Sequence, residues 1–398
     1  MKKDTKLNTT LDTKLVNAGR HKKFTGSAVN PSLVRASTIV FDSVAEMSEA
    51  ARGRDDGVAY YGRRGTSTTF ALSQAMIDLE NAAGCYVYSC GTAAITSCLL
   101  SFLSAGDHLL MVDSVYEPTR EFVDETLTRL QIETDYYNPL LGADIEHLIK
   151  SNTKVIFMES PGSLTMEVQD VPAISRVASA HGLVTMIDNT YATPFNFRPL
   201  DSGVDISIHS ATKYLSGHSD VMLGVASANE RTWRQLQKNS YQLGQCASVD
   251  DCYTTLRGLR TLPVRMRQHS ENALKLASWL SSHSLVDHVR HPALPTCPGH
   301  ESYSADFSGG NGLFSFVLKE FNTDALTKML DSFSYFKLGF SWGGYESLVL
   351  SATHFSKRRT ATDWHATGHL VRLHVGLEDF EDLQADLATG LNTFQDNL

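Results

Sequence analysis

The sequence has few of the features that mark membrane-spanning, secreted or nucleic-acid-binding proteins. It has no run of about 18 apolar residues that could cross a bilayer, and its start lacks a short apolar core followed by a small-residue cleavage site. Acidic residues outnumber basic ones by 44 to 35, so the net charge of −9 provides no positive field for a phosphate backbone. We therefore expect a cytoplasmic protein with no membrane and no nucleic-acid partner.

Cysteine is also scarce, with six residues in 398. In a reducing compartment such cysteines are usually buried as small apolar side chains rather than paired in disulfides. The spacing of the cysteines between residues 85 and 98 fits no zinc or cluster pattern closely, and neither do His291, Cys297 and His300 in a proline-rich segment. We expect no metal site.

The composition is that of a folded protein, with 42% hydrophobic and 20% charged residues. Residues 84–230 alternate between short β-rich runs and helical runs, the pattern of the crossover connections that build a parallel sheet. Five apolar runs are expected to be strands: CYVYS (85–89), HLLMVD (108–113), KVIFMES (154–160), LVTMID (183–188) and DISIHS (205–210). The sequence therefore predicts an α/β fold around a mostly parallel sheet of at least five or six strands.

The composition changes near residue 258, where an arginine-rich segment is expected to begin as a proline-containing loop and continue as one long helix. Beyond it, strand and helix patterns mix as in a smaller α/β unit. Residues 1–23 hold seven basic and two acidic side chains, which is typical of a solvated tail or of an arm on a neighbouring subunit. We predict an N-terminal arm contacting a neighbouring subunit (1–60), a large domain (61–258) and a C-terminal domain (259–398).

Two oppositely charged side chains follow neighbouring strands of the predicted sheet. Asp188 ends one apolar run, and Lys213 comes 25 residues later, just after the next. Ligands bind at the carboxyl ends of parallel strands, so both side chains are candidate site residues. A lysine buried there would have a lowered pKa, which suits Schiff-base chemistry. A purely structural Asp–Lys pair is the alternative.

A third strand end carries a possible anion site. The run CYVYS is followed by Cys90, Gly91 and Thr92, which open a helix with small residues. The backbone N–H groups of such a helix start could bind a phosphate. Because the segment matches neither a dinucleotide fingerprint nor a P-loop, an ordinary tight turn is the alternative.

The run SIHSATKYLSGHSD (207–220), together with the Asp188 strand and the turn at residues 90–92, resembles the pyridoxal-phosphate (PLP) enzymes of the transsulfuration family. The similarity is ordered and spans about residues 57–380. It implies the type I, aspartate-aminotransferase-like fold, with a mostly parallel sheet in a PLP-binding large domain and a smaller C-terminal α/β domain. It also implies a homotetramer built from catalytic dimers.

The resemblance assigns roles to individual residues. Lys213 would hold PLP as a Schiff base, Asp188 would pair with the pyridine nitrogen, and Tyr116 would stack on the ring. The phosphate would be bound by Gly91, Thr92, Ser210 and Thr212, and by Tyr61 and Arg63 of the neighbouring subunit. Arg372 would hold the substrate α-carboxylate, with Ser341 and Trp342 beside the substrate.

Several runs resemble one branch of the family, the bacterial cystathionine β-lyases. They are GRRGT (62–66), YEP (116–118), ESPGSLTMEV (159–168), GHSDVMLG (217–224) and FSWGGYES (340–347), although Phe340 replaces an expected tyrosine. The resemblance implies α,β-elimination of L-cystathionine to homocysteine, pyruvate and ammonia in methionine biosynthesis, with Lys213 as general base. Arg64 is a candidate partner for the distal carboxylate, or else a salt-bridged interface residue.

Other interpretations stay open on the sequence alone. Taken singly, Tyr61, Tyr116 and Arg372 could be ordinary interface or core residues. The chain could be another enzyme of the same family, namely a cystathionine γ-synthase or γ-lyase or a broad cysteine-S-conjugate β-lyase. It could also be a PLP-bound regulatory protein with little turnover. His209 and His218 flank Lys213 in the sequence, but we assign them no role.

Overall fold

The computed structural model describes residues 9–353, 359–362 and 368–398, and its larger sheet has seven strands in the order β1-β7-β6-β5-β4-β2-β3. The strands are β1 (Gly84–Tyr88), β2 (His108–Val112), β3 (Glu133–Tyr137), β4 (Thr153–Glu159), β5 (Val184–Asp188), β6 (Ile206–Ser210) and β7 (Gly224–Ala228). The pairs among β2 to β6 are parallel, whereas β7 is antiparallel to both β1 and β6. The mostly parallel sheet predicted from the sequence is confirmed.

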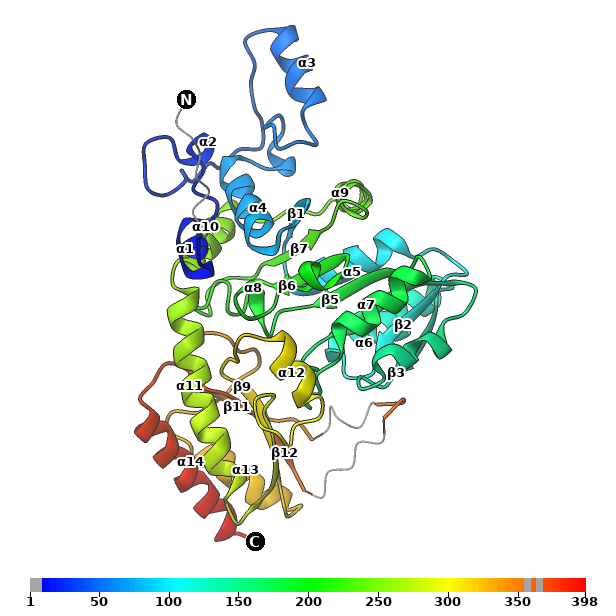
Figure 1. The fold of residues 1–398 in the computed structure, drawn as a ribbon. Helices are drawn as coiled ribbons and strands as arrows, with labels where there is room; N and C mark the ends of the chain where they lie inside the picture. The colour runs from blue at the N-terminus through cyan, green and yellow to red at the C-terminus, as the bar shows by residue number, and fades with distance from the viewer. Residues whose placement is uncertain (1–8, 354–358, 363–367) are drawn as a thin grey trace.

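Helices cover both faces of this sheet (Figure 1). The elements packed on it include α4 (Ser67–Glu80), α5 (Gly91–Phe102), α6 (Glu117–Glu121) with the π-helical turn Phe122–Leu127, α7 (Val171–Ala180) and α9 (Trp233–Gln242). Alternate residues of β1 belong to different cores: Tyr86 and Tyr88 pack with α5, and Cys85 and Val87 pack with α4. A strand covered on both faces is apolar along its whole length, which explains the continuous runs in the sequence.

A second, five-stranded sheet follows in the order β10-β11-β12-β9-β8. Its strands are β8 (Val286–Arg290), β9 (Leu313–Leu318), β10 (Lys337–Leu338), β11 (Leu348–Ser351) and β12 (Leu370–His374). The elements α11 (Leu262–Ser281), α13 (Thr323–Ser332) and α14 (Phe380–Gln395) share its core, and α12 (His300–Asp306) lies between the two sheets (Figure 1). Pro263 lies in the first turn of α11, not in the loop that we expected, because a helix tolerates proline there. The boundary at residues 258/259 stays a prediction, and it falls at the end of α10 (Val249–Leu259).

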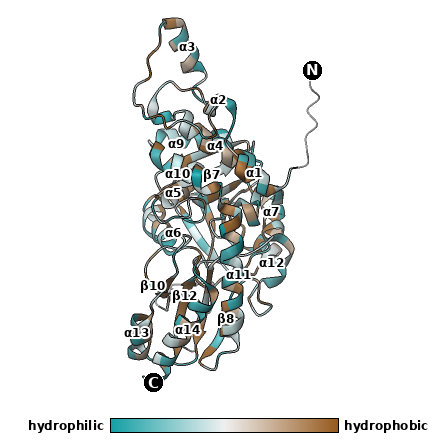
Figure 2. Cartoon of the chain, turned by 90° about the vertical axis from the view of Figure 1, so that its left-hand side faces the viewer, coloured by the Kyte–Doolittle hydropathy of each residue, from teal (hydrophilic) through white to brown (hydrophobic). Residues whose placement is uncertain are grey.

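The N-terminal segment divides into a packed part and a projecting part. In α1 (Leu11–Asn17), Leu15 is fully buried, and Arg260 donates to its carbonyl oxygen at 3.0 Å. The segment that carries α2 (Lys22–Thr25) and α3 (Val44–Arg52) extends beyond the body of the molecule (Figure 1), and Figure 2 shows hydrophobic residues along it. Among the described residues, no helix combines the length and the apolar character that a bilayer crossing requires.

Candidate active site

Lys213 lies in the turn that follows β6, where a loop of the second sheet meets it. Its Nζ donates a hydrogen bond to Ser341 Oγ and lies 5.4 Å from the centre of the Trp342 ring. Burial lowers the pKa of the Lys213 amine to about 8, and the positive charge of Arg372 adds to this effect while Asp188 opposes it. An amine with this pKa is partly neutral near physiological pH, so it can act as a nucleophile and as a base.

Asp188 ends the neighbouring strand β5 and is only 9% exposed. The backbone N–H and the hydroxyl of Thr190 both donate to Asp188 Oδ1. Burial raises the pKa of this carboxyl, while the Thr190 hydrogen bonds and the charges of His209 and Lys213 oppose the rise. The protein therefore orients the carboxylate through Oδ1, and no described residue forms a hydrogen bond with Oδ2.

Glu159, which our sequence analysis did not select, lies beside Asp188. It is the last residue of β4 and pairs in register with Asp188 of β5. Its Oε2 accepts a hydrogen bond from the Tyr116 backbone N–H at 2.7 Å. Burial and the neighbouring Asp188 raise the pKa of Glu159 well above its usual value. The strand-end argument that selected Asp188 applies equally to Glu159 and could have found it.

Tyr116 and Arg372 complete the group from opposite sides. Tyr116 is the N-cap residue of α6 and is 45% exposed. Burial raises the pKa of its phenol, and Glu159 and Asp188 add to the rise.

Arg372, on β12, is 7% exposed and donates to the Ser341 carbonyl oxygen at 2.9 Å. Burial lowers the pKa of Arg372 to about 10. No carboxylate of the described residues lies within ion-pair distance of this guanidinium, and its buried Nε has no hydrogen-bond partner there. Such a buried cation suits a carboxylate ligand.

The start of α5 meets the end of β6. At Gly91, the first residue of α5, a Cβ atom would lie 2.6 Å from the Ser210 Cβ, so the close approach requires glycine. Thr92 follows Gly91 and is exposed. The hydroxyl of Thr212 donates to the Leu223 carbonyl at 3.2 Å and accepts the Leu223 N–H at 3.0 Å, and its expected contact to the phosphate stays a prediction. The helix start and Ser210 form the candidate anion site.

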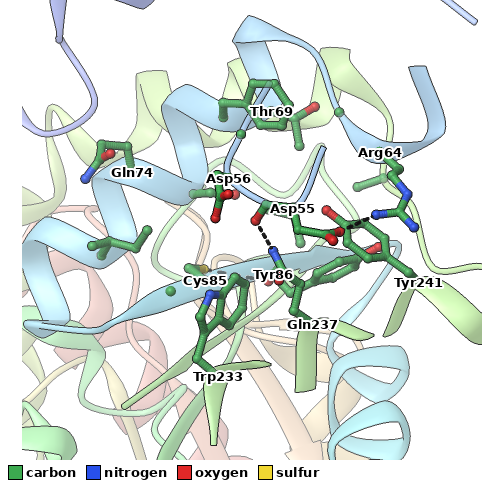
Figure 3. A pocket seen from close by; sticks show the side chains of 18 of the residues that line it. Asp55, Asp56, Arg64, Thr69, Gln74, Cys85, Tyr86, Trp233, Gln237 and Tyr241 are labelled. Atoms are coloured by element: carbon green, nitrogen blue, oxygen red, sulfur yellow. Dashed lines mark hydrogen bonds and ion pairs between the residues drawn. The ribbon is translucent and has the colours of Figure 1, made fainter. Parts of the chain in front are cut away.

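Arg63 and Arg64 lie at a different cavity of this chain, which Figure 3 shows with Arg64 labelled. They line a cavity of about 320 Å³ whose lining residues do not include Lys213, Asp188 or Arg372. Arg63 donates to the Tyr241 carbonyl at 3.1 Å, and Arg64 donates to Asp55 Oδ1 at 2.6 Å while its guanidinium lies 3.8 Å from the Tyr241 ring centre. Arg64 thus forms an ion pair within its own chain, and its candidate role toward the distal carboxylate stays a prediction.

Tyr61 and Arg63 are both exposed, at the start of the short helical turn Gly62–Arg64. Tyr61 is 45% exposed and forms an isolated antiparallel bridge with Thr38. Neither side chain has a contact with Lys213 in its own chain, as far as the described residues show. This placement is consistent with the expected role of these residues toward a neighbouring subunit, which stays a prediction.

The turn at residues 341–344 packs against Lys213, and a contact with β12 of the second sheet holds it there. Ser341 has a positive φ of 78°, and a Cβ atom at Gly343 would lie 3.0 Å from the Lys213 Cα. The Gly343 N–H lies 3.1 Å from Nε2 of His374, a buried residue of β12.

The two histidines that flank Lys213 in the sequence have other partners. The buried His209 contacts Glu80, and His218 Nδ1 lies 2.7 Å from the Ser216 carbonyl. These contacts give the two histidines structural partners.

The site as a whole fits PLP. Asp188 and Glu159 are two adjacent carboxyls whose pKa values are both raised, so a protonated pyridine nitrogen would relieve their mutual repulsion. A low-pKa lysine, an exposed aromatic ring and a helix start lie around them. This combination on a mostly parallel α/β sheet defines a PLP-dependent enzyme of fold type I.

Comparison with known proteins agrees. The family model for Cys/Met metabolism PLP-dependent enzymes matches residues 12–392, and the chain belongs to this family. It is 51% identical over 387 residues to the cystathionine beta-lyase MetC of Escherichia coli (strain K12), covering 96% of this chain and 98% of that protein. It is 50% identical to the cystathionine beta-lyase of Salmonella typhimurium, with the same coverage. Among solved structures, a cystathionine gamma synthase from Xanthomonas oryzae pv. oryzae aligns with a TM-score of 0.88 at 31% identity, over 98% of this chain and 100% of the other.

Proposed function

We propose that this chain catalyses the PLP-dependent α,β-elimination of L-cystathionine to homocysteine, pyruvate and ammonia. The observation that carries the proposal is the Lys213 amine, with its pKa of about 8, beside Asp188 and Ser341. Arg372 lies near it, and its guanidinium has no ion-pair partner among the described residues. The assignment to the cystathionine β-lyase branch of the family is supported by identities of about 50%, over 96% of the chain, to relatives named cystathionine beta-lyase. The cytoplasm stays the predicted compartment.

Different residues of the chain would hold different parts of the cofactor. Lys213 would be the covalent attachment point, Asp188 would pair with the pyridine nitrogen, and Tyr116 would stack on the ring. Gly91, Thr92, Ser210 and Thr212 would bind the phosphate at the start of α5 and the end of β6. When bound, PLP supplies the electron sink that makes the substrate Cα–H bond acidic.

Two side chains act on the substrate itself. Arg372 binds the α-carboxylate through its planar guanidinium, and its Nη2–Ser341 carbonyl contact keeps that group oriented. The neutral Lys213 amine takes the Cα proton as general base, and the resulting ammonium can return a proton to the departing sulfur. The Ser341 hydroxyl accepts a hydrogen bond from Lys213 Nζ and so orients this amine.

The identity of the keto acid product tests this function. Purified, PLP-loaded protein incubated with L-cystathionine should release pyruvate and homocysteine in equal amounts. Release of 2-oxobutyrate and cysteine instead would contradict β-elimination and assign the chain a γ-lyase activity. Turnover that stays negligible with cystathionine, cystine and other cysteine conjugates would favour the regulatory alternative.

We also propose that the active unit is a homo-oligomer in which Tyr61 and Arg63 complete the site of a neighbouring subunit. In a single chain both side chains are exposed and do not line the Lys213 site. The projecting segment around α3 also leaves Val40 86% and Val44 75% exposed, and apolar side chains so exposed suit a partner surface.

Mixing two inactive variants tests the shared site. Arg63→Ala and Lys213→Ala should each have little activity, but co-refolded hybrids should regain up to about a quarter of wild-type activity, because hybrid dimers hold one intact site. A control mixture of Lys213→Ala with Asp188→Ala, two changes in the same proposed site, should regain none. Hybrids without activity, or a fully active monomer in sedimentation, would contradict the proposal.

A further inference from the structure

Residues 359–362, which belong to the connection between β11 and β12, bind the larger sheet. Asp113, directly after β2, is only 2% exposed. Its Oδ1 accepts the Thr360 N–H at 3.0 Å, and its Oδ2 accepts the N–H groups of Ala361 and Thr362 at 3.0 and 2.9 Å. The Thr362 hydroxyl adds a fourth contact at 2.7 Å. One buried carboxylate thus binds three consecutive backbone N–H groups.

A second buried carboxylate lies beside the first. Glu167 accepts two hydrogen bonds from the Arg359 guanidinium, at 2.7 and 3.1 Å, and the two side chains are 8% and 7% exposed. Burial alone would raise the pKa of both acids. Contacts from Thr360, Thr362 and Arg120 hold the pKa of Asp113 below its usual value, and those from Arg359 do the same for Glu167. The hydrogen bonds therefore outweigh desolvation, and this segment is firmly docked.

The docked segment, the short orange piece between the grey traces in Figure 1, lies between the Tyr116 turn and the Arg372 strand in the order of contacts and chain. Asp113 is three residues before Tyr116, and the Ser114 carbonyl between them accepts the Ser163 N–H at 2.8 Å. On the other side, residues 360–362 precede β12, which carries Arg372. Asp113 is thus attached to the Tyr116 turn by its own backbone, and its hydrogen bonds hold residues 360–362 of the connection that leads to β12.

We infer that Asp113 is a positioning residue: by binding residues 360–362 it sets the separation between Arg372 and the Tyr116 turn, and through it the affinity for the substrate carboxylate. The inference rests on the proposed role of Arg372 in binding that carboxylate. Asp113 itself contacts none of the proposed reacting groups in the described structure; the hydrogen-bond partners of its carboxylate there are Arg120 and residues 360–362.

The substitution Asp113→Asn tests this inference in the PLP-loaded enzyme. The asparagine amide has one acceptor oxygen and one NH₂ donor group. The N–H groups that now donate to one of the two Asp113 oxygens would therefore face the NH₂ group instead. We expect faster hydrogen–deuterium exchange at residues 359–362 and a KM for cystathionine raised about tenfold, with kcat within about threefold and PLP content unchanged. Asp135→Asn, on the adjacent strand β3, is the matched control because Asp135 contacts Lys150 and His108 instead.

Thr362→Val provides a milder variant should Asp113→Asn fail to fold. It removes the hydroxyl contacts to Asp113 and Arg359 but keeps the backbone N–H contact to Asp113, and it should raise KM about threefold. Unchanged hydrogen–deuterium exchange in either variant would refute the anchor, and faster exchange with an unchanged KM would refute its positioning role.

A binding experiment distinguishes a failure of this inference from a failure of the proposed function. Its ligand is the free amino acid glycine, which has a carboxylate for Arg372 to bind but no Cβ leaving group to eliminate. Its dissociation constant, followed by cofactor absorbance, should rise about tenfold in Asp113→Asn even if the wild type eliminates nothing.

Discussion

Replacing Lys213 by alanine is expected to abolish both the visible absorbance of the bound cofactor and the elimination reaction, with kcat falling at least about 10³-fold. The magnitude follows from the loss of the covalent attachment point together with the general base. Absorbance spectra and pyruvate release, measured on protein reconstituted with PLP, check both effects. Circular dichroism should show an unchanged fold. Lys213 is only half-buried, so the substitution removes little packing together with the hydrogen bond from its amine to Ser341.

Lys154→Ala is a suitable control for this experiment. Lys154 lies on β4 of the same sheet and is exposed, so its removal should leave absorbance and rate within about twofold of wild type. If Lys213→Ala keeps a substantial rate, the base must be another residue. If it keeps the absorbance of a covalently bound cofactor, the attachment point must be another lysine.

Replacing Arg372 by leucine is expected to raise KM for cystathionine about 100-fold while leaving PLP content unchanged. A charge-assisted pair of hydrogen bonds to a carboxylate contributes about 1.5–3 kcal/mol, which corresponds to roughly 10- to 150-fold in affinity. Leucine keeps an apolar side chain in a position that is 7% exposed, so the cavity left behind is limited. Steady-state kinetics and cofactor absorbance separate the two effects.

Arg198→Leu serves as the control for Arg372, because Arg198 forms a surface ion pair with Asp201 at 2.6 Å. Its KM should match the wild type. A loss of PLP in Arg372→Leu, or an unchanged KM, would move Arg372 from substrate binding to a structural role.

The larger sheet could be predicted because its central strands are buried on both faces and therefore read as continuous apolar runs. Two strands lacked that signal. The edge strand β3 has the exposure pattern of a half-covered strand, and its sequence ETDYY alternates poorly. The strand β7, GVASA, is built mainly from small residues with weak β-propensity, although it is fully buried.

The candidate site was predictable only where the rule about strand ends applies. That rule selects Lys213 and Asp188, and Glu159 satisfies it too. The role of Arg372 came from family resemblance, because nothing local in its strand indicates that the guanidinium lacks an acid partner. The anchor on Asp113 depends on backbone N–H groups almost 250 residues away along the chain, and such contacts leave no local sequence pattern.

The location of the covalent attachment tests the central claim most directly. Borohydride reduction of the PLP-loaded protein makes the bond between cofactor and lysine permanent, and digestion followed by mass spectrometry identifies the modified residue. We predict a single phosphopyridoxyl group on the peptide that contains Lys213. A modification on a different lysine, or unmodified Lys213 in protein that turns over cystathionine, would contradict the account.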